Sequence, residues 1–309
     1  MPPAWRIALK RTTYLAIILF LLVTVTLAAT QGVAPANDMA VSTNWLAEHA
    51  KDAGLVVLHV GVDRKAYDAG HIPGARFVDM SDVATTRNGV PAQVPAPGDL
   101  KLALEKAGVG NESFVVTYGD GPLLATHVYF LLDYIGHGRH AILDGGPEKW
   151  KAEKRSLSTV AAEGKTATLT VKLHPELLVD LTAMQQIVKD KKTVLIDGRA
   201  ADQYSGATAS YGIKRGGHIP GAKNMFWMQT LVSRENPVLK PVGDIRALYE
   251  AAGAKTGKDV VVYCRTGLIA KHQYFTLKLA GFRPLVYDGS FMEWSNASET
   301  TVETGTGGL

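Results

Sequence analysis

The chain has 309 residues, of which 46% are apolar and 20% are charged, and its formal net charge is +4. This composition is typical of a globular protein long enough for two domains, and it excludes a disordered chain. Lysine and arginine are scattered rather than clustered, so the mild positive charge predicts no nucleic-acid partner. The single cysteine, Cys264, excludes an intramolecular disulfide and any cysteine pair that binds a metal or cycles between redox states.

The first 36 residues have the pattern of a signal peptide or an N-terminal membrane anchor. Residues 1–14 contain basic residues but no acidic one, and residues 15–29 form an almost unbroken apolar run followed by small residues. This run is short for a full membrane span, which favours a secretory signal cleaved after Ala28 or Ala36. An uncleaved segment 15–29 that tethers the protein to a membrane is the alternative. Both predict a periplasmic or otherwise exported protein.

Beyond residue 36, three motifs occur twice in the same order. The hexamer Gly-His-Ile-Pro-Gly-Ala at 70–75 recurs unchanged at 217–222. The pattern of residues 115–130, a β-branched run followed by Leu-Leu-Ala-Thr-His-Val-Tyr-Phe, matches that of residues 261–275. A motif Asp-Gly-[Gly/Ser]-x-x-x-Trp occupies 144–150 and 288–294. Repetition in one order at similar spacing predicts two copies of one domain.

Each copy alternates helices with short apolar strands. In the first copy we expect helices at 41–51, at 99–107 and after the strand near Val115, and strands at 55–60, 77–79 and 141–143. Such alternation is typical of an α/β fold with a mainly parallel sheet and helices on both faces. We expect domains at 40–155 and 176–300, joined by a linker at 156–175. A strand within the linker, at 167–173, is expected to lie along the second domain.

The stretch around Cys264 joins a predicted buried strand, 260–263, to a predicted helix, 270–279, through a loop of six residues. In such a loop several backbone N–H groups can converge on the sulfur, and the positive end of the following helix is directed at it. Both effects favour a thiolate. The geometry suits a nucleophile or an anion site, whereas a small hydrophobic core residue is the ordinary alternative for a lone cysteine.

Taken together, these motifs resemble the tandem rhodanese-domain sulfurtransferases over residues 40–297. The repeated hexamer, the Asp-Gly-Arg sequence at 197–199, the Tyr-Cys-Arg-Thr-Gly loop and the motif that ends in tryptophan carry the resemblance. The family pattern implies an N-terminal half without the nucleophile and a C-terminal half with it. Here Gly119 stands opposite Cys264, and Asp120 opposite Arg265, so the first domain is expected to be catalytically silent and to wall the site.

The resemblance implies that Cys264 accepts sulfur from a small anionic donor such as thiosulfate and passes it, as a persulfide, to an external thiol or cyanide. No cofactor and no metal are expected. Backbone amides of the loop would stabilise the persulfide anion, and Arg265 would bind the donor. The expected substrate-binding residues are Arg265, Thr266, Gly267, Leu268, Ile269, Ala270 and Arg199.

Three positions depart from the family pattern and leave the donor open. Thr266 stands where members that favour thiosulfate have a second cation, and Ile269 and Gln203 stand where relatives often carry arginine. The loop start Cys-Arg still looks like that of the thiosulfate-using members, while mercaptopyruvate is the other possible donor. The site is therefore less cationic than the resemblance implies.

Several other residues have a structural alternative. Arg199 could bind substrate, or it could form a structural ion pair with Asp197 or Glu293. The histidines of the repeated hexamer are expected to be structural because the silent half keeps its copy. His127 and His272 are expected to pack along their helices, and Trp150 and Trp294 are expected to be core or lid residues.

Two other classes of function share features with this sequence. A rhodanese-like module that binds or senses sulfur without turnover, at a membrane or in the periplasm, remains the alternative. A cysteine phosphatase shares the strand-loop-helix layout but needs an arginine six residues after the cysteine, to clamp phosphate oxygens. Ala270 occupies that position, which excludes a phosphatase.

Overall fold

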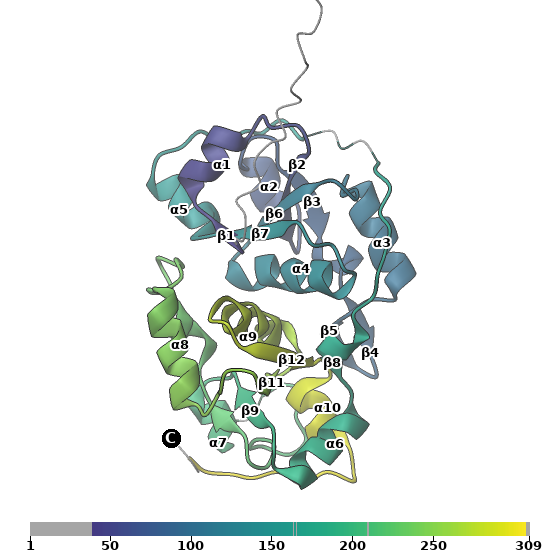
Figure 1. Ribbon diagram of the computed structural model, residues 1–309, viewed down its shortest axis with the longest axis vertical. Coiled ribbons are helices and arrows are strands. Elements are labelled where there is room, and N and C mark those ends of the chain that lie inside the picture. The colour runs from purple at the N-terminus through teal and green to yellow at the C-terminus, as the bar shows by residue number, and fades with distance from the viewer. Residues whose placement is uncertain (1–38, 163, 165, 209, 307–309) are drawn as a thin grey trace, which may run out of the picture. The chain divides into compact units, whose positions relative to one another are not determined.

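The computed structural model describes residues 39–306 except 163, 165 and 209 (Figure 1). The predicted signal or anchor, residues 1–36, lies outside the described residues. Within the part that is described, none of the helices combines the length and the apolar character that a membrane crossing requires.

The first half is built on a parallel five-stranded sheet with the strand order β1-β7-β6-β2-β3. Apolar and β-branched residues form its buried central strands. Its strands are β1 (Ala40–Val41), β2 (Leu55–Gly61), β3 (Arg76–Asp79), β6 (Phe114–Gly119) and β7 (His140–Leu143). Its helices are α1 (Thr43–His49), α2 (Lys65–Ala69), α3 (Pro97–Lys106), α4 (Pro122–Tyr134) and α5 (Gly146–Ala152), with a short 3-10 turn, η1, at Met80–Asp82.

The second half repeats this design with the strand order β10-β9-β11-β12-β8, again all parallel. Its strands are β8 (Leu178–Val179), β9 (Val194–Asp197), β10 (Lys223–Asn224), β11 (Asp259–Tyr263) and β12 (Arg283–Tyr287). Its helices are α6 (Leu181–Asp190), α7 (Ala201–Ser205), α8 (Val242–Ala251), α9 (Leu268–Leu279) and α10 (Ser290–Asn296), with 3-10 turns η2 (Pro175–Leu177) and η3 (Trp227–Thr230). The prediction of two parallel sheets with helices on both faces is confirmed.

Helices α4 and α9 pack against each other between the two sheets (Figure 1). Aromatic side chains meet edge to face there, with ring centroids 4.9 Å apart for Phe130 and Tyr274 and also for Tyr129 and Phe275. One apolar core therefore runs through both halves. Each sheet has a further core on its other face. Packing on both sides explains why α4 and α9 are buried on nearly every face, including polar side chains of α9.

A segment of each half also packs against the other half. In the first half, β4 (Thr85–Arg87) and β5 (Val90–Gln93) form an antiparallel hairpin. The backbone N–H of Val94, just after the hairpin, donates to the Asp288 carboxylate at 2.8 Å. Correspondingly, the backbone N–H of Leu239 donates to the Asp144 carboxylate at 2.9 Å. Because Asp144 and Asp288 occupy the same place in the repeated motif, the duplication extends to the contacts between the halves.

The prediction for the linker is wrong in two respects. Residues 167–173 form no strand, and they lie along the first half rather than the second. The N–H of Ala167 donates to the Glu105 carbonyl, and the N–H of Lys172 donates to the Ile135 carbonyl. The buried Leu169 joins the core of α3 and α4. The polar and charged residues of this segment face solvent, while single apolar residues anchor it, a pattern that resembles a strand in sequence.

The repeated hexamer has the same structural role in both halves. His71 stacks on Tyr67 with centroids 3.7 Å apart, and His218 stacks on Tyr204 at 3.8 Å. Each imidazole Nδ1 also lies within hydrogen-bond distance of the backbone carbonyl of the tyrosine on which it stacks. These contacts close the turn that leads into the next strand, and the prediction that both histidines are structural is confirmed.

Candidate active site

Cys264 lies directly after β11, where the chain leaves the sheet to enter α9. Its side chain is 1% exposed, and its Sγ accepts a hydrogen bond from the backbone N–H of Gly267 at 3.2 Å. The backbone N–H of Cys264 donates to Ser290 Oγ at 3.2 Å, and its carbonyl accepts from Phe291 N at 2.9 Å. The sulfur is thus fixed at the carboxyl edge of the sheet, next to the positive end of α9.

Gly267 is the N-cap of α9, which begins at Leu268 rather than at the predicted residue 270. Its φ is +94°, and a Cβ atom there would lie 2.6 Å from the backbone carbonyl oxygen of Asp288. Glycine is the residue that tolerates both this conformation and this close approach. The tight turn brings the Gly267 N–H onto the sulfur, as expected for a loop that stabilises a thiolate.

The other predicted loop residues surround the cysteine from one side. The Arg265 guanidinium donates to the backbone carbonyl of Tyr211 at 3.2 Å and remains partly exposed, so an anionic ligand can reach it. Thr266 and Ala270 are buried, while Leu268 and Ile269 are half-buried. The side chains of this loop therefore contribute one cation, and its backbone contributes the contact with the sulfur.

Arg199 is 1% exposed and lies in an ion pair with Asp197. Its Nε lies 3.0 Å from one carboxylate oxygen, and its Nη2 lies 2.5 Å from the other and 2.8 Å from the Gly217 carbonyl. The guanidinium also covers the ring of Phe291 at 4.1 Å. Burial by itself would lower the pKa of Arg199, but the Asp197 carboxylate and, to a smaller extent, Cys264 raise it above its ordinary value. The geometry favours the structural ion pair with Asp197, while the charge still acts on the sulfur.

Three buried residues that contact the cysteine loop or one another were not predicted as site residues from the sequence: Gln93, Lys271 and Asp288. Lys271 is fully buried, and its Nζ donates to Asp288 Oδ1 at 2.6 Å and to the Ala92 carbonyl at 3.0 Å. Gln93 reaches over from the first half, and its Nε2 donates to the backbone carbonyls of Thr266 and Asp288, each at 2.9 Å. Asp288 belongs to a repeated motif and could have been suspected, but nothing local in the sequence distinguishes Gln93.

The helix histidines and the tryptophans singled out in the sequence have packing roles. His127 and His272 are fully buried, and their Nε2 atoms lie within hydrogen-bond distance of the Val83 carbonyl and of Thr230 Oγ1, respectively. Burial lowers the pKa of His272 to about 3, so its imidazole is neutral at physiological pH. Trp150 and Trp294 are buried in the outer cores. The predictions that these residues pack are confirmed.

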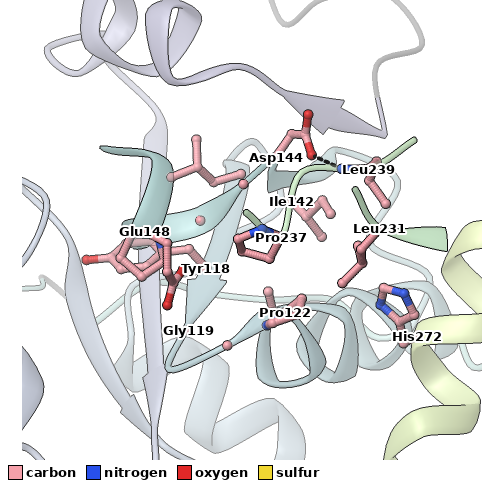
Figure 2. A pocket seen from close by; sticks show the side chains of 16 residues that line it. Tyr118, Gly119, Pro122, Ile142, Asp144, Glu148, Leu231, Pro237, Leu239 and His272 are labelled. Carbon is pink, nitrogen blue, oxygen red and sulfur yellow. Dashed lines mark hydrogen bonds between the residues drawn. The ribbon is translucent and has the colours of Figure 1, made fainter. Parts of the chain in front are cut away.

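The first half contains the same edge without a nucleophile. Figure 2 shows the small pocket there, with Gly119 beside Pro122 at the start of α4 and Asp144 joined to Leu239. A Cβ atom on Gly119 would lie 2.6 Å from the backbone carbonyl oxygen of Val60 and 2.8 Å from Leu124 Cβ. The position opposite Cys264 therefore has no room for a side chain, which supports the prediction that this half is catalytically silent.

Gly119→Cys is accordingly expected to lower the free energy of unfolding by about 1–3 kcal/mol, because the new Cβ displaces backbone of the neighbouring strand. Chemical denaturation followed by circular dichroism measures this loss. Gly138→Cys is the matched control, since a Cβ atom there meets no atom within 4 Å. Equal stability of the two variants would contradict the steric argument.

A cleft of about 450 Å³ opens beside the start of α4 and is bordered by Leu268 from the cysteine loop. Asp120 and Glu148 line it from the first half, and Arg234 lines it from the second. Burial raises the pKa of Glu148. Burial also lowers the pKa of His59, the partner of Asp120 at 2.8 Å, so the imidazole does not neutralise this carboxylate. The Asp120 carboxylate on this wall repels anions, whereas Arg265, which stands opposite it in the repeat, attracts them.

Both halves of the chain are similar to known proteins. The family model described as "Rhodanese-like domain" matches residues 42–153 and again residues 180–297. The sulfur carrier protein TtuD of Thermus thermophilus is 34% identical over 274 residues, covering 84% of this chain and 94% of that protein. A thiosulfate sulfurtransferase of Corynebacterium glutamicum is 31% identical over 286 residues, covering 86% and 90%.

Among solved structures, the chain resembles the anaerobic ergothioneine biosynthesis enzyme of Chlorobium limicola in complex with trimethyl histidine. The TM-score is 0.77 at 25% identity, over 86% of this chain and 70% of that one. Another similar structure, of EanB, has ergothioneine covalently linked with a cysteine persulfide, with a TM-score of 0.78. The names of these relatives support a function in sulfur transfer. The two domain matches and the identities over most of the chain show that it belongs to the rhodanese family, as a tandem of two rhodanese-like domains.

Proposed function

We propose that the protein is a sulfurtransferase that moves sulfane sulfur from thiosulfate, or a related small anionic donor, to an external acceptor through a persulfide on Cys264. The observation that carries this proposal is the hydrogen bond from the Gly267 N–H to the cysteine sulfur at the positive end of α9. A neutral thiol gains little from such an arrangement, whereas a thiolate or a persulfide anion is stabilised by it.

In the first step the Cys264 thiolate attacks the outer sulfur of thiosulfate. The sulfur–sulfur bond of the donor breaks, sulfite leaves with the electron pair, and a new sulfur–sulfur bond joins the transferred atom to Cys264. In the second step the acceptor, a thiolate or cyanide, attacks the outer sulfur of the persulfide, and the Cys264 thiolate leaves. Arg265 binds the anionic donor. The Gly267 N–H stabilises the negative charge on sulfur, first in the Cys264 thiolate and then in the persulfide.

Intact-mass spectrometry of the full chain tests this proposal. Incubation with thiosulfate is expected to add one sulfur atom to the wild-type protein and none to Cys264→Ser, and cyanide is expected to remove it as thiocyanate. Because the chain has one cysteine, the site of addition is unambiguous. No added sulfur from thiosulfate or mercaptopyruvate, in folded protein with a free thiol, would refute sulfur transfer at Cys264.

A second candidate function is a sulfur carrier without catalytic turnover, which the name of the Thermus thermophilus relative favours. The same experiment separates the two: a sulfurtransferase forms thiocyanate through many cycles with excess thiosulfate and cyanide, whereas a carrier forms about one equivalent per chain. Trimethyl histidine, named with one of the similar structures, is an acceptor to compare with cyanide and thiols.

Export from the cytoplasm also remains a proposal, and it rests on the basic and apolar pattern of residues 1–36 alone.

A further inference from the structure

The peptide group between Thr266 and Gly267 is held on both sides. Its carbonyl oxygen accepts a hydrogen bond from Gln93 Nε2 at 2.9 Å, and its N–H donates to Cys264 Sγ at 3.2 Å. In a trans peptide the carbonyl and the N–H point in opposite directions, so fixing the direction of one fixes the other. The contact from Gln93 therefore determines where this N–H points.

We propose that Gln93, in the domain that lacks the nucleophile, is a positioning residue for Cys264: by binding the Thr266 carbonyl, it holds the Gly267 N–H on the sulfur. This proposal rests on the sulfur-transfer function of Cys264 and assigns part of that site to the other domain. Hydrogen bonds in a chain polarise one another, so the bond from Gln93 also strengthens the donor that faces the sulfur anion.

Gln93 is itself held rigidly. It is 3% exposed, and its Nε2 is shared with the Asp288 carbonyl at 2.9 Å. On one side of it, the Ala92 carbonyl accepts from Lys271 Nζ at 3.0 Å; on the other, the Val94 N–H donates to Asp288 Oδ2 at 2.8 Å. The hairpin that carries Gln93 is thus fixed to the cysteine loop by hydrogen bonds on either side of the glutamine, and the amide has little freedom to turn away.

The duplication provides an internal comparison. The contact between the Val94 N–H and Asp288 is repeated in the first half by the Leu239 N–H and Asp144. Gln93 is not repeated, because Val238 precedes Leu239 where Gln93 precedes Val94. The contact between a backbone N–H and the aspartate has a structural role, because it occurs both in the half that has the cysteine and in the half that lacks it. The amide of Gln93 occurs only on the side where a sulfur atom has to be positioned.

The inference is tested by alkylation of Cys264 with iodoacetamide as a function of pH, in wild-type protein and in Gln93→Met. Methionine keeps the length of the side chain and removes the donor. We expect alkylation of the variant to be about three- to tenfold slower near neutral pH, the effect of one hydrogen bond to the thiolate, and to reach the same rate as the wild type at high pH. A merely structural role would not move the pH profile in this way.

Asp144→Leu is the matched control, because it removes the corresponding contact between the halves at the side without a cysteine. We expect it to lower stability but to leave the alkylation profile of Cys264 unchanged. Gln93→Asn covers the case in which the methionine variant does not fold: its amide is one methylene shorter, and the same slowing is expected. Circular dichroism establishes that each variant is folded.

An unchanged profile in folded Gln93→Met, or equal slowing in Asp144→Leu, would overturn the inference. Alkylation needs neither a sulfur donor nor turnover. A failure of the positioning role can therefore be distinguished from a failure of the sulfurtransferase proposal. If the wild type takes no sulfur but Gln93→Met is alkylated more slowly, the positioning role stands and the sulfurtransferase does not. If the wild type forms a persulfide and both profiles coincide, the positioning role alone is refuted.

Discussion

Lys271→Met is expected to lower the free energy of unfolding by about 3–5 kcal/mol, a large part of the stability of an ordinary domain. The Nζ atom is fully buried and lies 2.6 Å from Asp288 Oδ1, and the aspartate side chain is itself only 8% exposed. Removing the lysine leaves a buried carboxylate without its counter-charge and the Ala92 carbonyl without its donor. Urea denaturation followed by circular dichroism measures the loss.

Arg283→Met is the control for the loss of an ion pair as such. Its partner Asp259 lies 3.1 Å away, but the two side chains are 67% and 44% exposed, and the expected cost is below about 1 kcal/mol. The double variant Lys271→Met/Asp288→Asn is expected to be more stable than Lys271→Met, because it removes the uncompensated charge and keeps an oxygen for the Val94 N–H. A double variant no more stable than Lys271→Met would contradict the charge argument.

Lys271 also changes the electrostatic interpretation of the cysteine loop. From the sequence, the loop lacks a second cation because Thr266 and Ile269 replace basic residues. The structure places an ammonium group just behind Gly267, but Asp288 neutralises it there. Attraction of an anionic donor would therefore depend mainly on Arg265 and on the positive end of α9, because Arg199, like Lys271, is paired with a buried aspartate. We expect binding of thiosulfate to weaken with ionic strength mainly through Arg265, the partly exposed member of this group.

The sequence was informative where one local pattern determines one structure. Strand β11 and the turn of the repeated hexamer each follow from a short run of residues, and duplication made these runs recognisable, whereas α9 begins at Leu268 rather than at the predicted residue 270. The buried position of Cys264 at a strand end also followed from its neighbours. These features required only the periodicity of apolar residues and the conformational freedom of glycine.

The parts that could not be predicted involve residues distant in the chain. Gln93 binds the carbonyl of Thr266, 173 positions later, and a glutamine at the end of a short hairpin has no distinctive local pattern. In the sequence, Lys271 resembles an ordinary exposed lysine on a helix. In the structure it is fully buried, and its Nζ donates to the Ala92 carbonyl of the hairpin. The segment 167–173 was assigned to the wrong half because single anchoring residues such as Leu169 do not indicate which surface they contact. Contacts between residues distant in the chain decided all three.

Arg199→Met is expected to destabilise the second domain by about 3–5 kcal/mol, which distinguishes a structural ion pair from a substrate-binding residue. Asp197 is completely buried, and the variant would leave its carboxylate without the guanidinium that faces both of its oxygens. The variant also removes the donor to the Gly217 carbonyl and the cation over the Phe291 ring. Thermal unfolding of the purified protein measures this loss.

Arg199→Lys adds a second test, because lysine keeps the charge but cannot contact both carboxylate oxygens in the planar geometry of a guanidinium. We expect its stability to lie between those of the wild type and Arg199→Met. A substrate-binding arginine would behave differently: Arg199→Met would unfold at the wild-type temperature, and the KM for the sulfur donor would rise. Loss of stability with an unchanged KM, measured below the unfolding transition, would leave Arg265 as the side chain that binds the donor, with Arg199 acting on the sulfur only through its charge.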